Sequence, residues 1–408
     1  MSERRLRVFM MDLWATVPYY TAYLSRALLA DGVDVMVGSI TYYLDPDCFS
    51  SRGIKVDPGL LNIVGQYPLP ALPRRALKLM EALVNLSALT VRFLISPPDV
   101  IHVQFLPMLK WHLPLDLWFL TFCRSRGSRI VLTVHDLLPH NTGETYKPTF
   151  LELYQKVDRI ICHSEHIRTL LETEFSVAGN KVSVIPHGPF FYDLPPACAE
   201  QTSPSLEGQE SRSVQVLWQG IVSPYKGVDL LLRAWREVEA HGGDCELAIV
   251  GTGAPELLEQ IREQVKSLEL TRVELQLRFI SAQELVALYR AADIVVYPYR
   301  AITTSGALAT GLALGKAIIA SDLPVFRELL TDRENALLVD PQNQAELASA
   351  LMELAQDAAL REHLSSRVRA MDFGDRSWLS IAKKTSQVYR SALISPSRPS
   401  SSPLPGGV

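Results

Sequence analysis

The sequence predicts an α/β protein of two doubly wound domains, each with a parallel sheet, facing each other across a central cleft. The length of 408 residues exceeds one ordinary core and suits two domains of about 200 residues each. Short apolar runs alternate with longer helical patterns along the whole chain. Several runs, such as "IVLTV" and "IVVY", are apolar throughout, which is what parallel strands covered on both faces require.

Twelve such runs predict the strands. In chain order they are "LRVFMM", "DVMVGSI", "DVIHVQF", "RIVLTVHD", "DRIICHS" and "KVSVIPHG", then "SVQVLWQG", "CELAIVG", "VELQLRFI", "DIVVYP", "AIIASD" and "ALLVD". Helical patterns such as residues 20–30, 228–239 and 282–292 supply the crossover connections. We expect domains at residues 1–190 and 214–375, an irregular linker at 191–213, a helix at 376–393 and a disordered Pro- and Ser-rich tail at 394–408.

Composition excludes several classes of protein. A formal net charge of −4 gives no basic field for phosphate neutralisation, so no nucleic-acid partner is expected. The N-terminus reads as a first strand and not as a signal peptide, and no window has about 18 uncharged apolar residues. Widely spaced cysteines without a CxxC pattern predict reduced, buried thiols in a cytoplasmic protein; they are Cys48, Cys123, Cys162, Cys198 and Cys245.

The stretch "PRRALKLMEALVNLSALTVRFLI", residues 73–95, is the most apolar helical pattern, yet it contains five charged residues. A helix docked on its own domain is the preferred interpretation. An amphipathic helix resting on a membrane stays open as the alternative.

Ligands of open parallel sheets bind beyond the carboxyl ends of the strands, so residues that follow strands are candidates for a site. In "QGIVSPYKGVDLLLRAW", Lys226 and Gly227 stand just before a helix, where a cation and a helix start together attract phosphate. The alternative is a solvated surface lysine. "VGTGAPELLEQI" is a second glycine turn, for which a tight turn without a ligand is the alternative.

"TVHDLLPH" places His135 and Asp136 at the carboxyl end of an apolar strand, with His140 shortly after. An imidazole there can hydrogen-bond a hydroxyl or exchange a proton, whereas a histidine buried in the core is the alternative. The histidines show no HExxH-type spacing, so no metal site is expected.

The segment "PYRAITTSGALATGLALGK" predicts a helix built of small, uncharged residues. A solvent-facing helix would carry Glu and Lys. This one is therefore packed on all sides or turns its first residues, near Gly306, toward a ligand that approaches the backbone closely.

These segments, taken in order from about residue 6 to 393, resemble glycosyltransferase family 4, a group of GT-B enzymes with two Rossmann-like lobes. The resemblance rests on "VPYYTAYLSRALLADGVDV", "IVLTVHDLLPH", "DRIICHSEHIRTLLETEF" and "VSVIPHG" in the first half, and on the lysine turn, "LAIVGTG", "ISAQELVALYRAADIVVYPYR" and "TSGALATGLALGKAIIASDLPVFRELL" in the second. It implies that the helix at residues 376–393 crosses back to cover the first lobe.

The resemblance also implies a function, namely transfer of a sugar from a nucleoside diphosphate sugar with retention at the anomeric carbon, without metal or other cofactor. The second lobe then holds the donor and the first the acceptor, with His135 and Lys226 as catalytic residues. The donor-binding candidates are Gly220, Lys226, Gly251, Gly253, Ile280, Arg300, Thr303, Thr304, Ser305, Gly306 and Thr310. The acceptor-binding candidates are Asp12, Tyr19, Tyr20, Asp136 and His140.

Two departures from the family pattern mark this chain. Ile221 stands where many relatives have arginine after the glycine of the first motif. The two glutamates of the family hallmark, separated by seven residues, are replaced by Ile302 and Thr310. Arg300 is a candidate substitute cation, and we expect an active variant subgroup.

The resulting hypothesis is a hexosyltransferase of polysaccharide or glycolipid biosynthesis that acts on a glycan, glycolipid or lipid-linked acceptor. It is expected in the cytoplasm, with peripheral contact at the inner face of the cell membrane left open. A nucleotide-sugar epimerase on the same fold and a non-catalytic sugar-nucleotide-binding protein are the alternatives.

Overall fold

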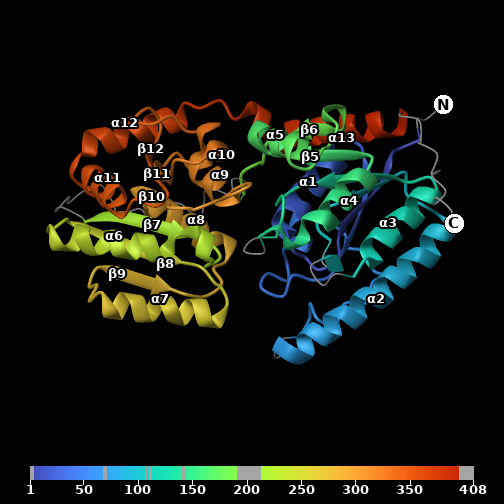
Figure 1. Ribbon diagram of the computed structural model, residues 1–408, viewed down its shortest axis with the longest axis horizontal. Coiled ribbons are helices and arrows are strands. Elements are labelled where there is room, and N and C mark those ends of the chain that lie inside the picture. The colour runs from blue at the N-terminus through green and yellow to red at the C-terminus, as the bar shows by residue number, and fades with distance from the viewer. Residues whose placement is uncertain are drawn as a thin grey trace, which may run out of the picture.

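Two α/β lobes, each built on a parallel sheet, lie side by side in the computed structural model (Figure 1). The structure describes residues 4–67, 71–106, 108–109, 113–139, 143–190 and 213–394. The predicted linker, apart from its last residue, and the predicted tail, apart from Ile394, lie outside this part of the chain.

The first lobe contains a six-stranded sheet in the order β2-β1-β3-β4-β5-β6, in which every neighbouring pair is parallel. Its strands are β1 (Arg7–Asp12), β2 (Asp34–Ser39), β3 (Val100–Val103), β4 (Arg129–Thr133), β5 (Arg159–Cys162) and β6 (Val182–Val184). Its helices are α1 (Pro18–Ala30), α2 (Ala71–Ile95), α3 (Leu115–Ser125), α4 (Lys147–Lys156) and α5 (Glu165–Thr173).

The second lobe also contains a six-stranded sheet with parallel neighbours, in the different order β12-β11-β10-β7-β8-β9. Its strands are β7 (Val214–Gln219), β8 (Cys245–Val250), β9 (Val273–Gln276), β10 (Ile294–Tyr297), β11 (Ala317–Ser321) and β12 (Leu337–Val339). Its helices are α6 (Val228–Ala240), α7 (Pro255–Ser267), α8 (Ala282–Ala291), α9 (Gly306–Ala313), α10 (Pro324–Arg327), α11 (Gln344–Gln356) and α12 (Ala358–Arg369). The expected fold class and all twelve predicted strands are confirmed.

Each sheet is buried on both faces because successive side chains of a strand point to opposite sides. In β1, Phe9 and Met11 pack toward α2 and α3, whereas Val8 and Met10 pack toward α1. The second sheet likewise lies between a layer containing α6, α7 and α11 and a layer containing α8, α9 and α10. This explains why the strand sequences are apolar throughout instead of alternating.

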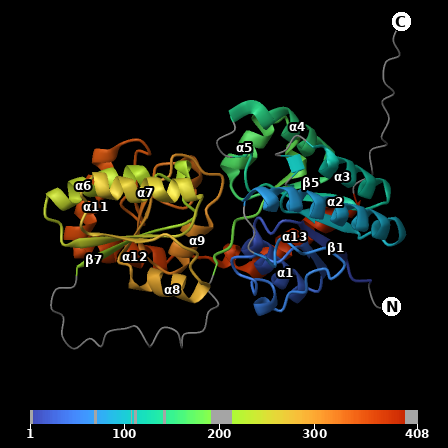
Figure 2. The ribbon, with the colours of Figure 1, turned by 90° about the horizontal axis from the view of Figure 1, so that it is seen from below.

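The last described helix, α13 (Trp378–Ile394), belongs to the core of the first lobe although it follows the second in sequence. It packs against α1 on the face of the sheet opposite α2 and α3 (Figure 2). Buried Trp378 and Tyr389 anchor its two ends. The chain therefore passes between the lobes twice.

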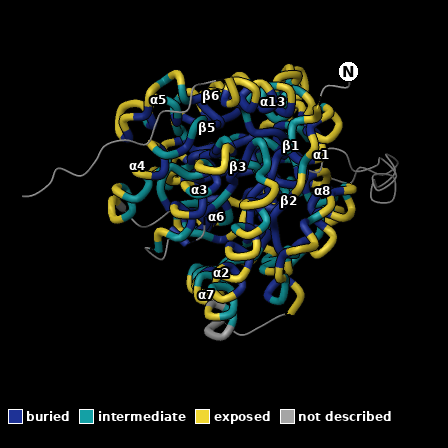
Figure 3. Tube along the Cα trace, turned by 90° about the vertical axis from the view of Figure 1, so that its right-hand side faces the viewer, coloured by how far each residue is buried: buried dark blue, intermediate teal, exposed yellow. Residues whose placement is uncertain are grey.

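Burial follows this layering, with the strands dark and the outer helix faces exposed in Figure 3. Cys48, Cys123, Cys162 and Cys245 are buried free thiols, as expected, and Cys198 lies outside the described residues. No described helix combines the length and apolarity needed to cross a membrane.

Candidate active site

Two glycines hold Lys226 beyond the carboxyl end of β7. Its Nζ lies over Gly220, where an added Cβ would be only 2.6 Å from that nitrogen. Gly227 has φ of 66°, a conformation that disfavours side chains, and an added Cβ there would lie 1.9 Å from the carbonyl oxygen of Pro298. Glycine at both positions therefore allows the lysine turn to fold against the end of β10.

The ammonium of Lys226 is an unpaired cation in a half-buried position. Among the residues that the structure describes, no carboxylate forms an ion pair with it, and its Nζ lies 5.7 Å from the centre of the Tyr299 ring. Burial lowers the pKa of Lys226 from 10.5 to about 8, because desolvation disfavours the charged form. An anionic ligand at this position would supply the missing counter-charge.

Helix α9 begins beside Lys226 and explains its small-residue sequence. Ser305 caps it, with Oγ accepting a hydrogen bond from the backbone N–H of Leu308 at 3.1 Å. The hydroxyls of Tyr297 and Tyr289 both donate to the carbonyl oxygen of Ala307, at 2.9 and 3.2 Å. The helix is thus pinned to the sheet, and its first turn faces the cleft with N–H groups that a helix cannot satisfy internally.

A cleft of about 280 Å³ joins these features to the first lobe. The second lobe contributes Gln219, Gly220, Ile221, Lys226, Gly251, Thr252, Arg278, Phe279, Ile280, Leu285, Gly306, Ala307 and Thr310, and the first lobe contributes Thr16, Pro18, Tyr19, Tyr42 and Phe190. Tyr19 is oriented by donating to Asp45 at 2.8 Å. The cleft therefore brings together the unpaired Lys226, Arg278 in its ion pair with Glu284, helix amides and aromatic rings.

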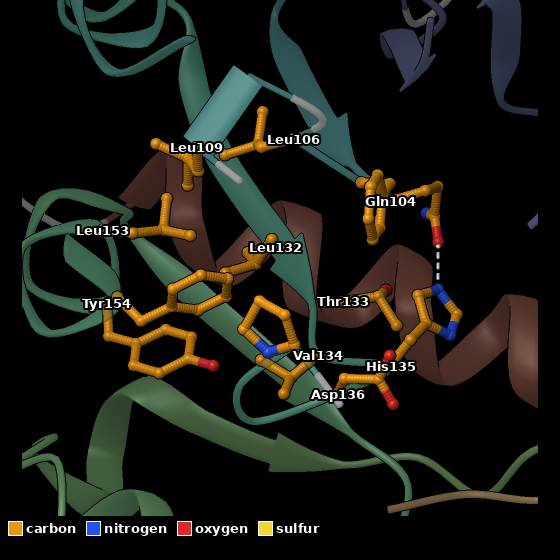
Figure 4. Close-up of a pocket in the computed structure, with 13 residues that line it drawn as sticks. Gln104, Leu106, Leu109, Leu132, Thr133, Val134, His135, Asp136, Leu153 and Tyr154 are labelled. Atoms are coloured by element: carbon orange, nitrogen blue, oxygen red, sulfur yellow. Dashed lines mark hydrogen bonds between the residues drawn. The ribbon is translucent and has the colours of Figure 1, made fainter. Parts of the chain in front are cut away.

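His135 follows β4 in the first lobe and is held as a neutral imidazole. Its Nε2 donates to Gln104 Oε1 at 3.0 Å, since that oxygen can only accept (Figure 4). Burial, with further contributions from His163, His187 and His102, lowers its pKa well below 6.5. Nδ1 is then unprotonated and can accept a hydrogen bond from a hydroxyl. The expected exchange of a proton near neutral pH is disfavoured at such a site.

Asp12 and Tyr20 do not line the cleft, but they contact residues next to it. Asp12 is fully buried and accepts hydrogen bonds from the backbone N–H of Thr16 at 2.8 Å and Val17 at 3.1 Å. Burial raises its pKa to about 6. Tyr20 lies edge-on to His135, with 4.7 Å between ring centres. Asp12 thus orders the turn that starts α1, and Tyr20 supports the imidazole.

Other predicted residues lie in separate hollows. Thr303, Thr304 and Ser305 line a hollow of about 30 Å³ on the far side of the first turn of α9. Arg300 lies in another, where its guanidinium donates two hydrogen bonds, at 2.8 and 2.7 Å, to the Asp229 carboxylate.

The remaining candidates are placed as follows. His135 and Asp136 both line a small cavity of about 40 Å³ in the first lobe, separate from the residues that line the interlobe cleft. Gly253 forms a bridge to Val222, and Ile302 packs against the core, outside the cleft lining. His140 lies outside the described residues.

Sequence reasoning missed several residues that the structure brings to the site. Gln104 directly follows β3, so the same search beyond strand ends would have found it. Phe190 and Arg278 lie in less regular segments with no comparable signal. No group of three or more His, Cys, Asp or Glu suited to a metal ion occurs within the described ranges.

Comparisons with known proteins agree with this geometry. A model described as Glycosyltransferase Family 4 matches residues 17–188, and one described as Glycosyl transferases group 1 matches residues 213–357. An uncharacterized glycosyltransferase of Methanocaldococcus jannaschii is 24% identical over 60% of this chain and 62% of its own length. A phosphatidyl-myo-inositol mannosyltransferase of Mycobacterium leprae is 32% identical over 48% of this chain and 52% of its own length. The chain thus aligns with little more than half of either relative.

A solved structure extends the fold comparison over nearly the whole chain. The HepE protein of Anabaena, in complex with UDP and glucose, has a TM-score of 0.73 and 17% identity, covering 95% of this chain and 100% of that one. Two lobes with parallel sheets, facing each other across a cleft, define the GT-B fold. Because the two family models match both lobes, the chain belongs to the glycosyltransferase family 4 group of this fold.

Proposed function

We propose that the protein is a retaining glycosyltransferase that moves a sugar from a nucleoside diphosphate sugar to a lipid-linked or glycan acceptor, without a metal ion. The observation that carries the proposal is the unpaired Lys226 beside the first turn of α9. A departing nucleoside diphosphate needs this combination of a cation and oriented amides, because charge accumulates on its phosphate oxygens as the glycosidic bond breaks.

The structure supports a donor position in the part of the cleft formed by the second lobe. Gly251 has a φ of 146° and an added Cβ would lie 1.9 Å from the carbonyl oxygen of Gly220, so the two glycine turns meet closely. Ile280 and Phe279 line the same cleft with apolar surface suited to a base. The Anabaena neighbour, solved with UDP, adds support for a nucleotide here.

His135 is proposed to orient the transferred sugar. As a neutral imidazole whose Nε2 is committed to Gln104, it offers Nδ1 as an acceptor for a sugar hydroxyl. No protein nucleophile is proposed. The leaving phosphate takes the proton from the acceptor hydroxyl on the same face of the sugar, which preserves the anomeric configuration, while Lys226 stabilises the charge on that phosphate.

The acceptor is proposed to be a lipid-linked alcohol or sugar. The mannosyltransferase of Mycobacterium leprae carries a phosphatidyl-myo-inositol acceptor in its name, which supports this class. Tyr19, Tyr42 and Phe190 provide an aromatic wall on the first lobe.

The second candidate function is non-catalytic binding of a nucleotide sugar, and it is favoured by Ile302 and Thr310. Thr310 lines the cleft, but its hydroxyl already donates to the carbonyl oxygen of Gly306 at 2.8 Å. Ile302 offers no polar group. A protein that binds the nucleotide sugar without turnover would fit these two positions, whereas an epimerase would also need an acid and a base near the sugar.

The decisive experiment measures nucleoside diphosphate release from UDP-, GDP-, ADP- and dTDP-sugars, with lipid and soluble acceptors, in the presence of EDTA. Donor- and acceptor-dependent release, with an NMR product spectrum of unchanged anomeric configuration, is expected. Thermal stabilisation by a donor without release would favour the non-catalytic alternative. Inversion of configuration, or loss of activity in EDTA, would contradict the proposed mechanism.

A further inference from the structure

Helix α2 presents an uncharged face to solvent along about five turns. The exposed residues between 76 and 95 are Ala76, Met80, Leu83, Val84, Ser87, Ala88, Val91, Leu94 and Ile95. The large side chains among them are far from buried, with exposures of 60% for Met80, 63% for Val91 and 82% for Ile95. The opposite side of α2 packs on the core through Ala82, Leu86, Leu89 and Phe93. The helix is therefore apolar on both sides, which is unusual for one at a surface.

Between residues 76 and 95, the charged side chains of α2 turn away from this face. Lys78 lies 5.2 Å from the Trp14 ring, and buried Glu81 accepts hydrogen bonds from the backbone of Ile63 and Val64. Arg92 pairs with Asp57. The charges of the helix thus support neighbouring loops, and the outward face is left without any.

Helix α3 extends the apolar surface. Trp118 is 62% exposed, and α3 packs beside α2. Arg126, just beyond α3, donates to the carbonyl oxygen of Leu94 at 3.1 Å and so borders the end of the apolar face. Exposed Lys55 lies in the loop segment that precedes α2. We call this surface, formed by the exposed residues of α2 with Trp118 and Arg126, the α2–α3 face.

The segments that form this region carry buried acidic side chains, and Asp99, the residue after them, is partly exposed and pairs with Arg4 and Arg7. In residues 53–98 and 113–128, as far as the structure describes them, the only acids are Asp57, Glu81 and Asp116, which are 4%, 2% and 0% exposed. The surface charges of these segments are therefore cationic.

We propose that the α2–α3 face docks the first lobe on an anionic lipid surface. Apolar side chains with a tryptophan enter the boundary between headgroups and acyl chains, and neighbouring cations attract the headgroups. A second copy of the chain fits less well. A twofold interface would place this face against itself, so its cations would meet cations without an acidic partner.

The position of α2 relates this surface to the cleft. Near its start, Arg74 lies 3.8 Å from the Tyr43 ring, and Tyr43 in turn contacts Tyr42 of the cleft wall. Figure 1 shows α2 running along the underside of the first lobe from the interlobe side outward. A lipid-held acceptor, which rests on the proposed function, would thus enter the cleft from the docked side.

The test is co-sedimentation of the full chain with vesicles of phosphatidylcholine alone and of phosphatidylcholine with 30% phosphatidylglycerol. The protein is expected to bind the anionic vesicles, and each cation at the surface to contribute roughly fivefold. The Val84→Glu/Val91→Glu variant should lower partitioning by at least about tenfold. Arg126→Gln should lower it less, and only on anionic vesicles at low salt.

A matched control is Met36→Glu/Leu379→Glu, which places the same charges at residues 42% and 50% exposed, outside the α2–α3 face. It should sediment like the unmodified chain, and both double variants should unfold at the same temperature as it. Equal binding by the two double variants, or no vesicle binding by the unmodified chain, would overturn the proposal. So would a dimer in analytical ultracentrifugation that Val84→Glu/Val91→Glu dissociates. With a soluble acceptor and no vesicles, these variants should release nucleoside diphosphate as fast as the unmodified chain. This measurement separates failure of docking from failure of the proposed transferase activity.

Discussion

Both lobes contain a six-stranded parallel sheet, but the two sheets differ in the charge of the side chains near the carboxyl ends of their strands. The first lobe places His135, His163 and His187 just beyond its strands and His102 within β3, and burial lowers the pKa of each, to about 3 for His102 and His187 and about 4 for His163. In the second lobe, Lys226 lies beyond the carboxyl end of β7 and keeps its charge up to a pKa of about 8. The same kind of lobe thus holds neutral imidazoles near its strand ends in one case and a cation in the cleft lining in the other.

Replacement of Lys226 tests the charged side and should have the largest effect. Lys226→Ala is expected to lower kcat/KM for the donor by about 10²–10³, because the variant lacks the cation that stabilises the leaving group. Steady-state release of nucleoside diphosphate measures this. The control is Lys266→Ala on the exposed side of α7, and an equal loss in both variants would contradict the assignment.

The glycine that seats the lysine can be tested by stability. Gly227→Ala and Gly242→Ala both place a side chain at positive φ, 66° and 71°, but only the first meets the backbone, with Gly242 having nothing within 4 Å. Gly242→Ala should cost about 1 kcal/mol of unfolding free energy and Gly227→Ala about 2 kcal/mol more. Denaturant unfolding measures both, and equal costs would show that the turn relaxes freely.

The pH dependence separates the two lobes further. Lys226 is charged below its pKa of about 8, so kcat/KM for the donor should be flat from pH 6 to 7.5 and fall above pH 8. His135 is neutral throughout and should add no acidic limb in this range. Lys226→Arg should move the alkaline limb upward, since arginine stays protonated. An alkaline limb unchanged in that variant would assign the limb to another group.

In the first lobe, His135→Ala should lower turnover by about tenfold, because the variant loses one hydrogen bond between neutral groups. Nucleotide affinity should change little. Separate kcat and donor-binding measurements distinguish these effects. His241→Ala, at the exposed end of α6, is the control. A loss as large as that of Lys226→Ala would show that His135 carries charge during the reaction.

The smallest expected effect concerns a contact between the lobes. The carboxylate of Glu328 in the second lobe accepts hydrogen bonds from the backbone N–H groups of Glu165 and His166, at 3.0 and 2.8 Å, at the start of α5 in the first. Glu328→Gln should cost about 0.3–1 kcal/mol, because a charge at a helix N-terminus is lost. Thermal unfolding beside the control Glu263→Gln measures it, and no difference would mean that this contact does not hold the lobes.

The fold could be predicted because its signal is local. Apolar runs of strand length, separated by helical patterns, identified all twelve strands. The site was harder because its contacts join distant residues. Arg300 was expected near phosphate, yet it pairs with Asp229, 71 residues earlier, and His135 depends on Gln104, 31 residues away. Sequence spacing carries no information on such pairs. It is equally silent on Lys226, because the lack of an ion-pairing carboxylate among the described residues is visible only in three dimensions.

Helix α13 has a consequence for synthesis on the ribosome. Trp378, Ile381 and Tyr389 complete a core whose other members, such as Val8 and Tyr23, are made first. Domains usually fold in the order in which they emerge. Here the sheet of the first lobe can be fully covered on both faces only after the second lobe and α13 have been translated. A chain interrupted before Trp378 would therefore expose apolar surface in the lobe that was made earliest, and quality control could recognise it there.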